Sequence, residues 1–95
     1  MRSHFEWDKQ KAATNLRKHG VSFDEARTIF SDPLARIFDD PEHSLDEMRE
    51  IMIGRSITQR LLMVSFAERG AAIRIISARL ATKREQRDYE ENILV

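Results

Sequence analysis

The sequence predicts an α+β domain in which helices pack on one face of a four-stranded antiparallel sheet. Two capped segments with helical spacing come first, four short apolar runs follow, and a third helix start comes after the last run. The runs are separated by short connections, which favour antiparallel neighbours because a parallel pair needs a longer crossover. A chain of 95 residues suffices for one modest core, so we expect a single domain over residues 1–95.

The first helix is predicted between Asp8 and Gly20. The carboxylate of Asp8 can accept hydrogen bonds from the free backbone N–H groups of the first turn. Basic residues in the last turn and the following glycine are typical of a helix end. The expected apolar stripe consists of Ala12, Ala13 and Leu16.

The second helix is predicted to begin at Ser22, which has a glutamate three residues later, at Glu25. This spacing is that of a capping box, and Val21 against Ala26 has the spacing of a hydrophobic staple. Apolar residues at helical spacing then indicate the face that packs on the sheet. They are Phe23, Ala26 and Phe30.

Four runs rich in branched and aromatic residues predict the strands. They are "LARIF" (34–38), "MREIMIG" (48–54), "RLLMVSFA" (60–67) and "AAIRIISAR" (71–79). An acidic loop, "DDPEHSLDE" (39–47), separates the first two. The last helix is predicted from Thr82, because Thr82 and Glu85 form another capping box.

Composition excludes several chemistries. The chain has no cysteine, so disulfides, thiolate zinc sites and a cysteine nucleophile are excluded. His4, His19 and His43 have no metal-ligand spacing, and the three glycines form no phosphate-binding loop. No serine lies in a nucleophile-elbow pattern. We therefore expect no metal and no cofactor.

No apolar run approaches the roughly 20 residues that a membrane span requires. The start "MRSHFEWDKQ" lacks the apolar core and the small-residue cleavage site of a signal peptide. We therefore expect a cytoplasmic protein that does not associate with membranes. The lack of cysteine is compatible with that reducing compartment.

The formal net charge of zero conceals two halves of opposite charge. Residues 31–50 contain seven acids and two bases, whereas residues 51–87 contain eight bases and two acids. This asymmetry suggests an anionic partner for the second half, although the acidic loop could instead pair with those bases internally.

Arg74 lies in the middle of an apolar strand, where an arginine is costly to bury without a partner. One interpretation is a structural ion pair with a carboxylate of residues 39–50. The other is a guanidinium that binds phosphate through its two parallel donors. Strand alternation places Arg74 and Arg79 on opposite sides, so both face one site only if the chain turns or bulges between them.

Arg79 precedes the last helix, whose N-terminus offers free N–H groups and a partial positive charge. With Lys83 and Arg84 it forms a candidate phosphate site. The alternative is ordinary pairing along the helix, Arg84 with Asp88 and Arg87 with Glu91. Three other residues also have structural explanations that need no function. His19 is favoured near a helix C-terminus by the helix dipole. Tyr89 and Trp7 can be core residues.

Two motifs together resemble the BrnT family of bacterial toxins. They are "WDKQKAATNLRKHGVSF" and "RIISARLATKRE", with "EMRE", "IGRS" and "LLMVSF" in order between them. The resemblance extends from Phe5 to Glu90. It implies a RelE-like fold and a ribonuclease toxin of a type II toxin–antitoxin module. It also implies a BrnA-type ribbon-helix-helix antitoxin, which neutralises the toxin, binds operator DNA and represses the operon with it.

The resemblance further implies metal-independent cleavage, with the 2′-hydroxyl of RNA as the nucleophile. Such a reaction needs alignment, proton transfer and stabilisation of charge on the phosphorane-like transition state. We expect Arg74, Arg79 and Arg49 to bind the phosphate. The candidate general bases are Glu47, His19 and Tyr89, and the bases expected to extend the RNA-binding track are Lys83 and Arg84.

A second hypothesis retains the protein partner but assigns the domain no catalytic activity. The domain would be a protein-binding module that reaches nucleic acid only through its antitoxin, or an inactive family member retained for operon repression. The net charge of zero favours this view, because dedicated nucleic-acid binders are usually basic.

Overall fold

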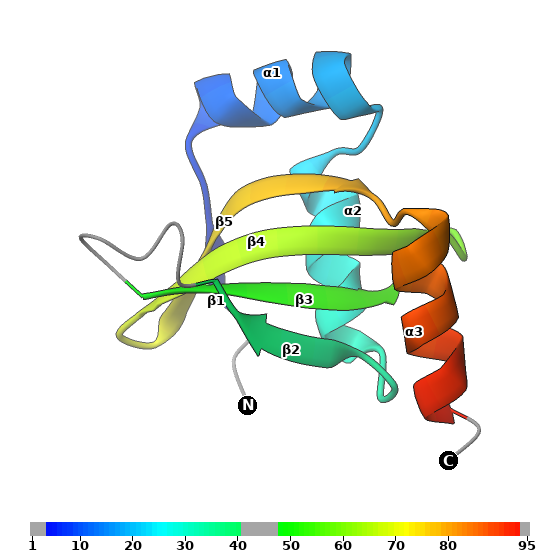
Figure 1. Cartoon of the computed structure of the whole chain (residues 1–95). Helices are drawn as coiled ribbons and strands as arrows, with labels where there is room; N and C mark the ends of the chain where they lie inside the picture. The colour runs from blue at the N-terminus through cyan, green and yellow to red at the C-terminus, as the bar shows by residue number, and fades with distance from the viewer. Residues whose placement is uncertain (1–3, 41–47, 94–95) are drawn as a thin grey trace.

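The computed structural model describes residues 4–40 and 48–93 and shows a five-stranded sheet with three α-helices (Figure 1). The first strand precedes two α-helices and a 3₁₀ helix, four strands follow, and the third α-helix comes last among the described elements. The elements are β1 (His4–Glu6), α1 (Lys9–His19), α2 (Phe23–Arg27), η1 (Thr28–Ser31), β2 (Arg36–Asp39), β3 (Arg49–Arg55), β4 (Leu61–Arg69), β5 (Ala72–Leu80) and α3 (Lys83–Ile93).

The sheet is mixed, with the strand order β1-β5-β4-β3-β2. The four predicted strands pair antiparallel, as expected. The expected four-stranded, wholly antiparallel sheet is nevertheless wrong, because β1 adds a fifth strand, parallel to β5. β1 has only three residues, too few for a period-2 pattern to be recognised. It forms by pairing with residues almost seventy positions away.

The main core lies between one face of the sheet and the segment α2–η1, which lies behind the sheet in Figure 1. Phe30 packs edge-to-face between Phe5 and Phe66, with ring centroids 5.1 and 5.0 Å apart. Trp7 packs against Phe23 in the same way. The buried members of this core are Val21, Phe23, Ala26, Ile29, Met52, Leu62, Val64, Phe66, Ile73, Ile75 and Ala78.

The expectation that both N-terminal helices cover the sheet face is wrong for α1. This helix lies along the edge of the sheet beside β5, in the part of β5 that β1 leaves unpaired (Figure 1). Leu16, an expected core residue, is half exposed, whereas the polar Asn15 is buried. The Asn15 side chain donates to the carbonyl oxygens of Val21 (3.0 Å) and Ala78 (2.8 Å) and accepts from the Ala78 N–H (3.1 Å).

The predicted helix ends are largely confirmed. Asp8 accepts from the backbone N–H groups of residues 10 and 11, and Gly20 ends α1 in the left-handed conformation, with φ of 68°. The hydroxyl of Ser22 accepts from the Glu25 N–H, as a capping box requires. The Thr82 and Glu85 box is reciprocal, with each side chain accepting the backbone N–H of the other residue.

The helix α3 packs across one end of the opposite face of the sheet, where Tyr89 forms a small second core with Ile53 and Leu61. The Tyr89 hydroxyl donates to Asp32 at 2.7 Å. Burial and this hydrogen bond raise the pKa of Tyr89 to about 12. Asp32 also accepts from the Arg55 N–H at 2.8 Å, so α3 is joined through one carboxylate to the segment before β2 and to β3.

A carboxylate also fixes the β3–β4 turn to α2. Glu25 accepts hydrogen bonds from the hydroxyls of Ser56 (2.7 Å) and Thr58 (2.6 Å) and forms an ion pair with the Arg60 guanidinium. The same guanidinium donates to the carbonyl oxygen of Gly20 at 3.1 Å. The bonds from Arg60, and then those from the two hydroxyls, lower the pKa of Glu25 from 4.5 to about 2.

This network predicts a loss of stability in acid. Because the folded pKa of Glu25 is depressed, its contribution is present above the unfolded pKa of about 4.5 and is lost as the pH falls towards 2. After allowance for solvent screening at the partly exposed Arg60, we expect a loss of about 1–3 kcal/mol. Urea unfolding at pH 7 and pH 3 measures it. In Glu25→Gln the pH dependence should be smaller by that amount, and an equal dependence in both proteins would contradict the assignment.

Candidate nucleic-acid interface

Among residues 4–40 and 48–93, α3 covers one end of the sheet face opposite α2. We call the remainder of it the open face. It carries the side chains of β3, β4 and β5 that alternate with the main core residues. They are Arg49, Ile51, Met63, Ser65, Ala67, Arg74, Ile76, Ser77 and Arg79.

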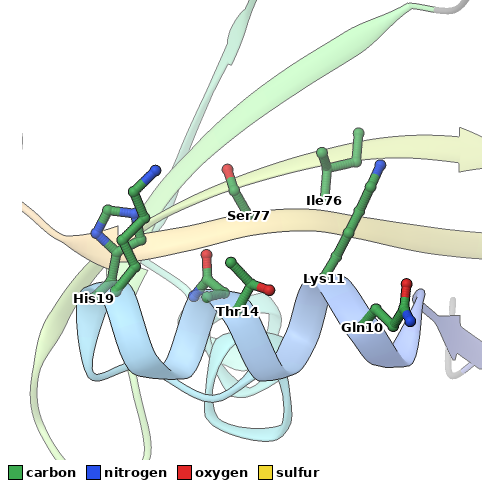
Figure 2. Close-up of a pocket in the computed structure, with 8 residues that line it drawn as sticks. Gln10, Lys11, Thr14, His19, Ile76 and Ser77 are labelled. Atoms are coloured by element: carbon green, nitrogen blue, oxygen red, sulfur yellow. The ribbon is translucent and has the colours of Figure 1, made fainter.

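A β-bulge in β5 decides which arginines share this face. Ser65 of β4 pairs with Ser77, whereas the next residue, Phe66, pairs with Ile75, so Ile76 is an extra residue in β5. An extra residue reverses the alternation of the strand beyond it. Figure 2 shows the result directly, because the side chains of Ile76 and Ser77 point the same way.

The bulge brings Arg74 and Arg79 to the same face. Ile75 and Ala78 are both buried in the core, and the arginines flank them on the other side of the strand. Uninterrupted alternation would have separated the two arginines. With a strand rise of about 3.3 Å per residue, their Cα atoms lie roughly 15 Å apart.

Arg49 and Arg74 are in the same cross-strand row. Both pair with Ala67, from β3 and β5 respectively, so they lie two strand spacings apart, about 10 Å. The row continues to Glu6 of β1, whose carboxylate accepts from Arg74 Nη1 at 3.2 Å. The structural interpretation of Arg74 predicted a partner in residues 39–50, but this ion pair is with β1. Both partners are partly exposed, so the pair remains accessible to an anion.

Arg79 is oriented by Glu85 at the start of α3. Its two terminal nitrogens donate to the two carboxylate oxygens at 2.8 and 2.9 Å, and one also contacts the sulfur of Met63 at 2.7 Å. These bonds lower the pKa of Glu85 and raise that of Arg79. Lys83 and Arg84, the expected extension of the track, are exposed in the first turn of α3.

His19 lies in a groove between α1 and β5. The groove has a volume of about 400 Å³ and is open to solvent. Figure 2 shows Lys11 extending from α1 towards Ile76, with His19 at the opposite end. The lining residues are Gln10, Lys11, Thr14, Asn15, Lys18, His19, Ile76 and Ser77. Since Ser77 also belongs to the open face, the groove and the open face share a border.

The other two candidate bases are placed differently. Tyr89 is only 3% exposed and its hydroxyl donates to Asp32, so it belongs to the second core rather than to an accessible surface. Glu47 lies outside the described residues, as do His43 and most of the acidic loop. The structure thus brings Arg49, Arg74 and Arg79 to one face, with His19 beside it.

Three functional candidates were not found from the sequence. Glu6 and Glu85 orient the arginines, and Lys11 lines the groove. The sequence indicated Glu85 only as a helix-capping residue, and for Lys11 a signal existed because α1 contains four basic residues besides His19 and no acid. The role of Glu6 depends on the parallel pairing of β1, which has no local signature.

Within residues 4–40 and 48–93, no three His, Asp or Glu side chains are grouped so that they could hold a metal ion. In the same ranges, no helix has the length and the apolar composition needed to cross a membrane.

Comparisons with known proteins find a matching family model and a similar solved structure. A family model described as "Ribonuclease toxin, BrnT, of type II toxin-antitoxin system" matches residues 7–85. The crystal structure of the Brucella abortus ribonuclease toxin BrnT is similar, with a TM-score of 0.66 and 28% sequence identity. The alignment covers 85% of this chain and 100% of that one. No curated protein sequence matches significantly.

Proposed function

The chain belongs to the BrnT family of ribonuclease toxins of type II toxin–antitoxin systems, and from this we propose that it cleaves RNA on the open face, without a metal ion. Toxins of type II systems have a protein as antitoxin, so a protein partner follows from the family. The observation that supports the proposed site is the β-bulge, because it brings Arg74 and Arg79 to the same face of the sheet as Arg49.

The proposed reaction is an attack by the 2′-oxygen of a ribose on the adjacent phosphorus. The bond from phosphorus to the 5′-oxygen of the next nucleotide breaks, and a 2′,3′-cyclic phosphate forms. A base removes the proton of the 2′-hydroxyl, and an acid donates a proton to the departing 5′-oxygen. Negative charge accumulates on the non-bridging oxygens, where fixed guanidinium groups stabilise it most effectively.

Geometry suggests how the arginines share this task. Although the Cα atoms of Arg74 and Arg79 lie roughly 15 Å apart along β5, both side chains are long, and we propose that they converge on the scissile phosphate above Ser77. Arg49 lies across Ala67 from Arg74 and acts with it. Glu6 and Glu85 hold the two β5 arginines in place before RNA binds, and a phosphate then competes with, or shares, those carboxylates.

His19 is the candidate general base that we retain. It is exposed, lies in the groove that borders Ser77, and carries an imidazole, the group used most often for proton transfer. Tyr89 is omitted because it is buried and its pKa is raised to about 12.

We further propose that the antitoxin is of the BrnA type, with a ribbon-helix-helix part that binds operator DNA, and that it inhibits the toxin in the cytoplasm by covering the open face. An acidic segment of the partner suits the arginines there. The test is RNA binding by the preformed toxin–antitoxin complex. Undiminished binding would contradict inhibition by occupation.

The experiment that tests the reaction uses two RNAs of the same sequence in buffer with a chelator. One is all-ribose, and the other has a single 2′-deoxynucleotide at the site that is cut in the first. We expect cleavage of the first RNA to products ending in a 2′,3′-cyclic phosphate, and no cleavage at the modified position. Equal cleavage of both RNAs, or dependence on added metal, would contradict the proposal.

One observation favours the non-catalytic alternative, in which the chain binds its partner and co-represses the operon. Both β5 arginines form ion pairs with carboxylates of this chain. Pairs of this kind occur in purely structural roles. If the wild-type chain, free of antitoxin, neither cleaves RNA nor slows growth, this alternative replaces the enzyme.

A further inference from the structure

The side of α1 that borders the groove is polar and basic, whereas Ala12 on the same helix packs against the main core. Lys11, Thr14, Asn15 and Lys18 follow one another at helical spacing, and all of them line the groove. Only Asn15 is buried, through its bonds to the edge of β5. The other side chains of this face are exposed to solvent.

The charge of the groove is of one sign. Two lysines and a histidine are among its eight lining residues, and none of the eight is acidic. The helix itself has the sequence "KQKAATNLRKH" and contains no acid, and Asp8, the N-cap residue, interacts electrostatically with Lys11 from just outside it. In a chain with a formal net charge of zero, this local excess of positive charge favours an anionic ligand.

The groove is continuous with the open face. Ile76 and Ser77 line it, and Ser77 lies on β5 between Arg74 and Arg79. The bulge is responsible, because the extra residue Ile76 turns Ser77 towards the open face. An extended anion that contacts the arginines can therefore pass over the edge of β5 and enter the groove beside Lys11 (Figure 2).

We propose that this groove binds the sugar-phosphate backbone of single-stranded RNA next to the cleavage site, with Lys11 and Lys18 as phosphate ligands. Gln10, Thr14 and Ser77 add neutral donors and acceptors suited to phosphate and ribose oxygens. A volume of about 400 Å³ is near the lower limit of ordinary ligand sites, roughly 300 Å³, and accommodates one strand rather than a duplex. The lining contains no Phe, Tyr or Trp side chain for base stacking, so the contacts are mainly to the backbone and depend little on sequence.

This inference rests on the proposed function only for the identity of the ligand. The test is fluorescence anisotropy of a short single-stranded RNA with 2′-O-methyl groups, which cannot be cleaved, titrated at several salt concentrations. For Lys11→Ala/Lys18→Ala we expect binding about tenfold weaker at low salt. The slope of log affinity against log salt should decrease in magnitude by about 1.4, or about 0.7 for each phosphate that a lysine no longer neutralises.

The matched control is Arg27→Ala/Arg87→Ala, which removes the same charge from exposed positions of α2 and α3 outside the groove. It should leave the slope unchanged. An unchanged slope in the lysine variant, an equal decrease in both variants, or no binding by the wild type overturns the inference. The inference is also overturned if a poly-glutamate peptide needs the two lysines for binding and RNA does not. That result would assign the groove to an acidic protein segment.

The cleavage assay separates the two proposals. If the wild type fails to cleave RNA but the lysine variant shows the expected change in slope, the groove is supported and the proposed reaction is not. If the wild type cleaves RNA and the lysine variant binds with the wild-type slope, only the groove inference is overturned.

Discussion

Arg74→Ala and Arg79→Ala are each expected to lower the rate of RNA cleavage by about 10²–10³-fold, because each removes a preorganised donor from the developing charge of the transition state. The change should appear mainly in single-turnover cleavage at saturating protein, since other bases still hold the RNA. Lysine at either position should restore only part of the rate, because an ammonium group cannot form the paired hydrogen bonds of a guanidinium.

The control for this expectation is Arg87→Ala, which removes an exposed arginine of α3 from outside the open face. It should cleave at the wild-type rate. Thermal unfolding of each variant shows whether removal of the pair with Glu6 or Glu85 affects the fold. Folded variants of Arg74 and Arg79 that cleave as fast as Arg87→Ala would remove both residues from the site.

Asn15→Ala is expected to destabilise the fold by about 2–4 kcal/mol, because it leaves three buried backbone groups without their hydrogen bonds. These groups are the N–H and C=O of Ala78 and the C=O of Val21. For a domain of this size each kcal/mol lowers the melting temperature by roughly 4–8 °C. Thermal unfolding followed by circular dichroism measures the effect.

Two matched variants make this expectation specific. Thr14→Ala changes the neighbouring exposed residue and should alter stability by less than about 0.5 kcal/mol. Asn15→Asp keeps an acceptor for the Ala78 N–H but loses both donated bonds, and it should also be strongly destabilised. If Asn15→Ala unfolds at the same temperature as Thr14→Ala, the amide does not join α1 to β5 as described.

Local signals were sufficient for most of the fold. The caps at Asp8, Ser22 and Thr82 each depend on residues within three positions of one another, and all three are present. The four predicted strands lie within two residues of their observed bounds, because their hydrophobic patterns are strong. The resemblance to BrnT toxins, based on two motifs, agrees with the family match over residues 7–85.

Long-range pairing accounts for the errors in the fold. β1 has three residues and depends on a parallel partner near the other end of the sequence. Helical spacing predicted that α1 packs through an apolar stripe, but the buried residue of this helix is Asn15. The asparagine is buried because it completes the hydrogen bonding of an exposed strand edge, and no periodicity in the sequence indicates this.

The site was predictable in part. An arginine inside an apolar strand and another before a helix cap identified Arg74 and Arg79 as unusual. Their placement on one face depends on a single inserted residue, Ile76, whose effect is visible only in the register with β4. The sequence was therefore sufficient to identify the two arginines as candidates, whereas the bulge determines that they share one face of the sheet.

The most direct test of RNA binding at the open face is a comparison of backbone amide chemical shifts with and without a non-cleavable single-stranded RNA. We expect the largest changes on the open face, at Ser65, Arg74, Ser77 and Arg79. Changes confined to α2 and the β3–β4 turn, on the opposite side of the sheet, would contradict the proposed site.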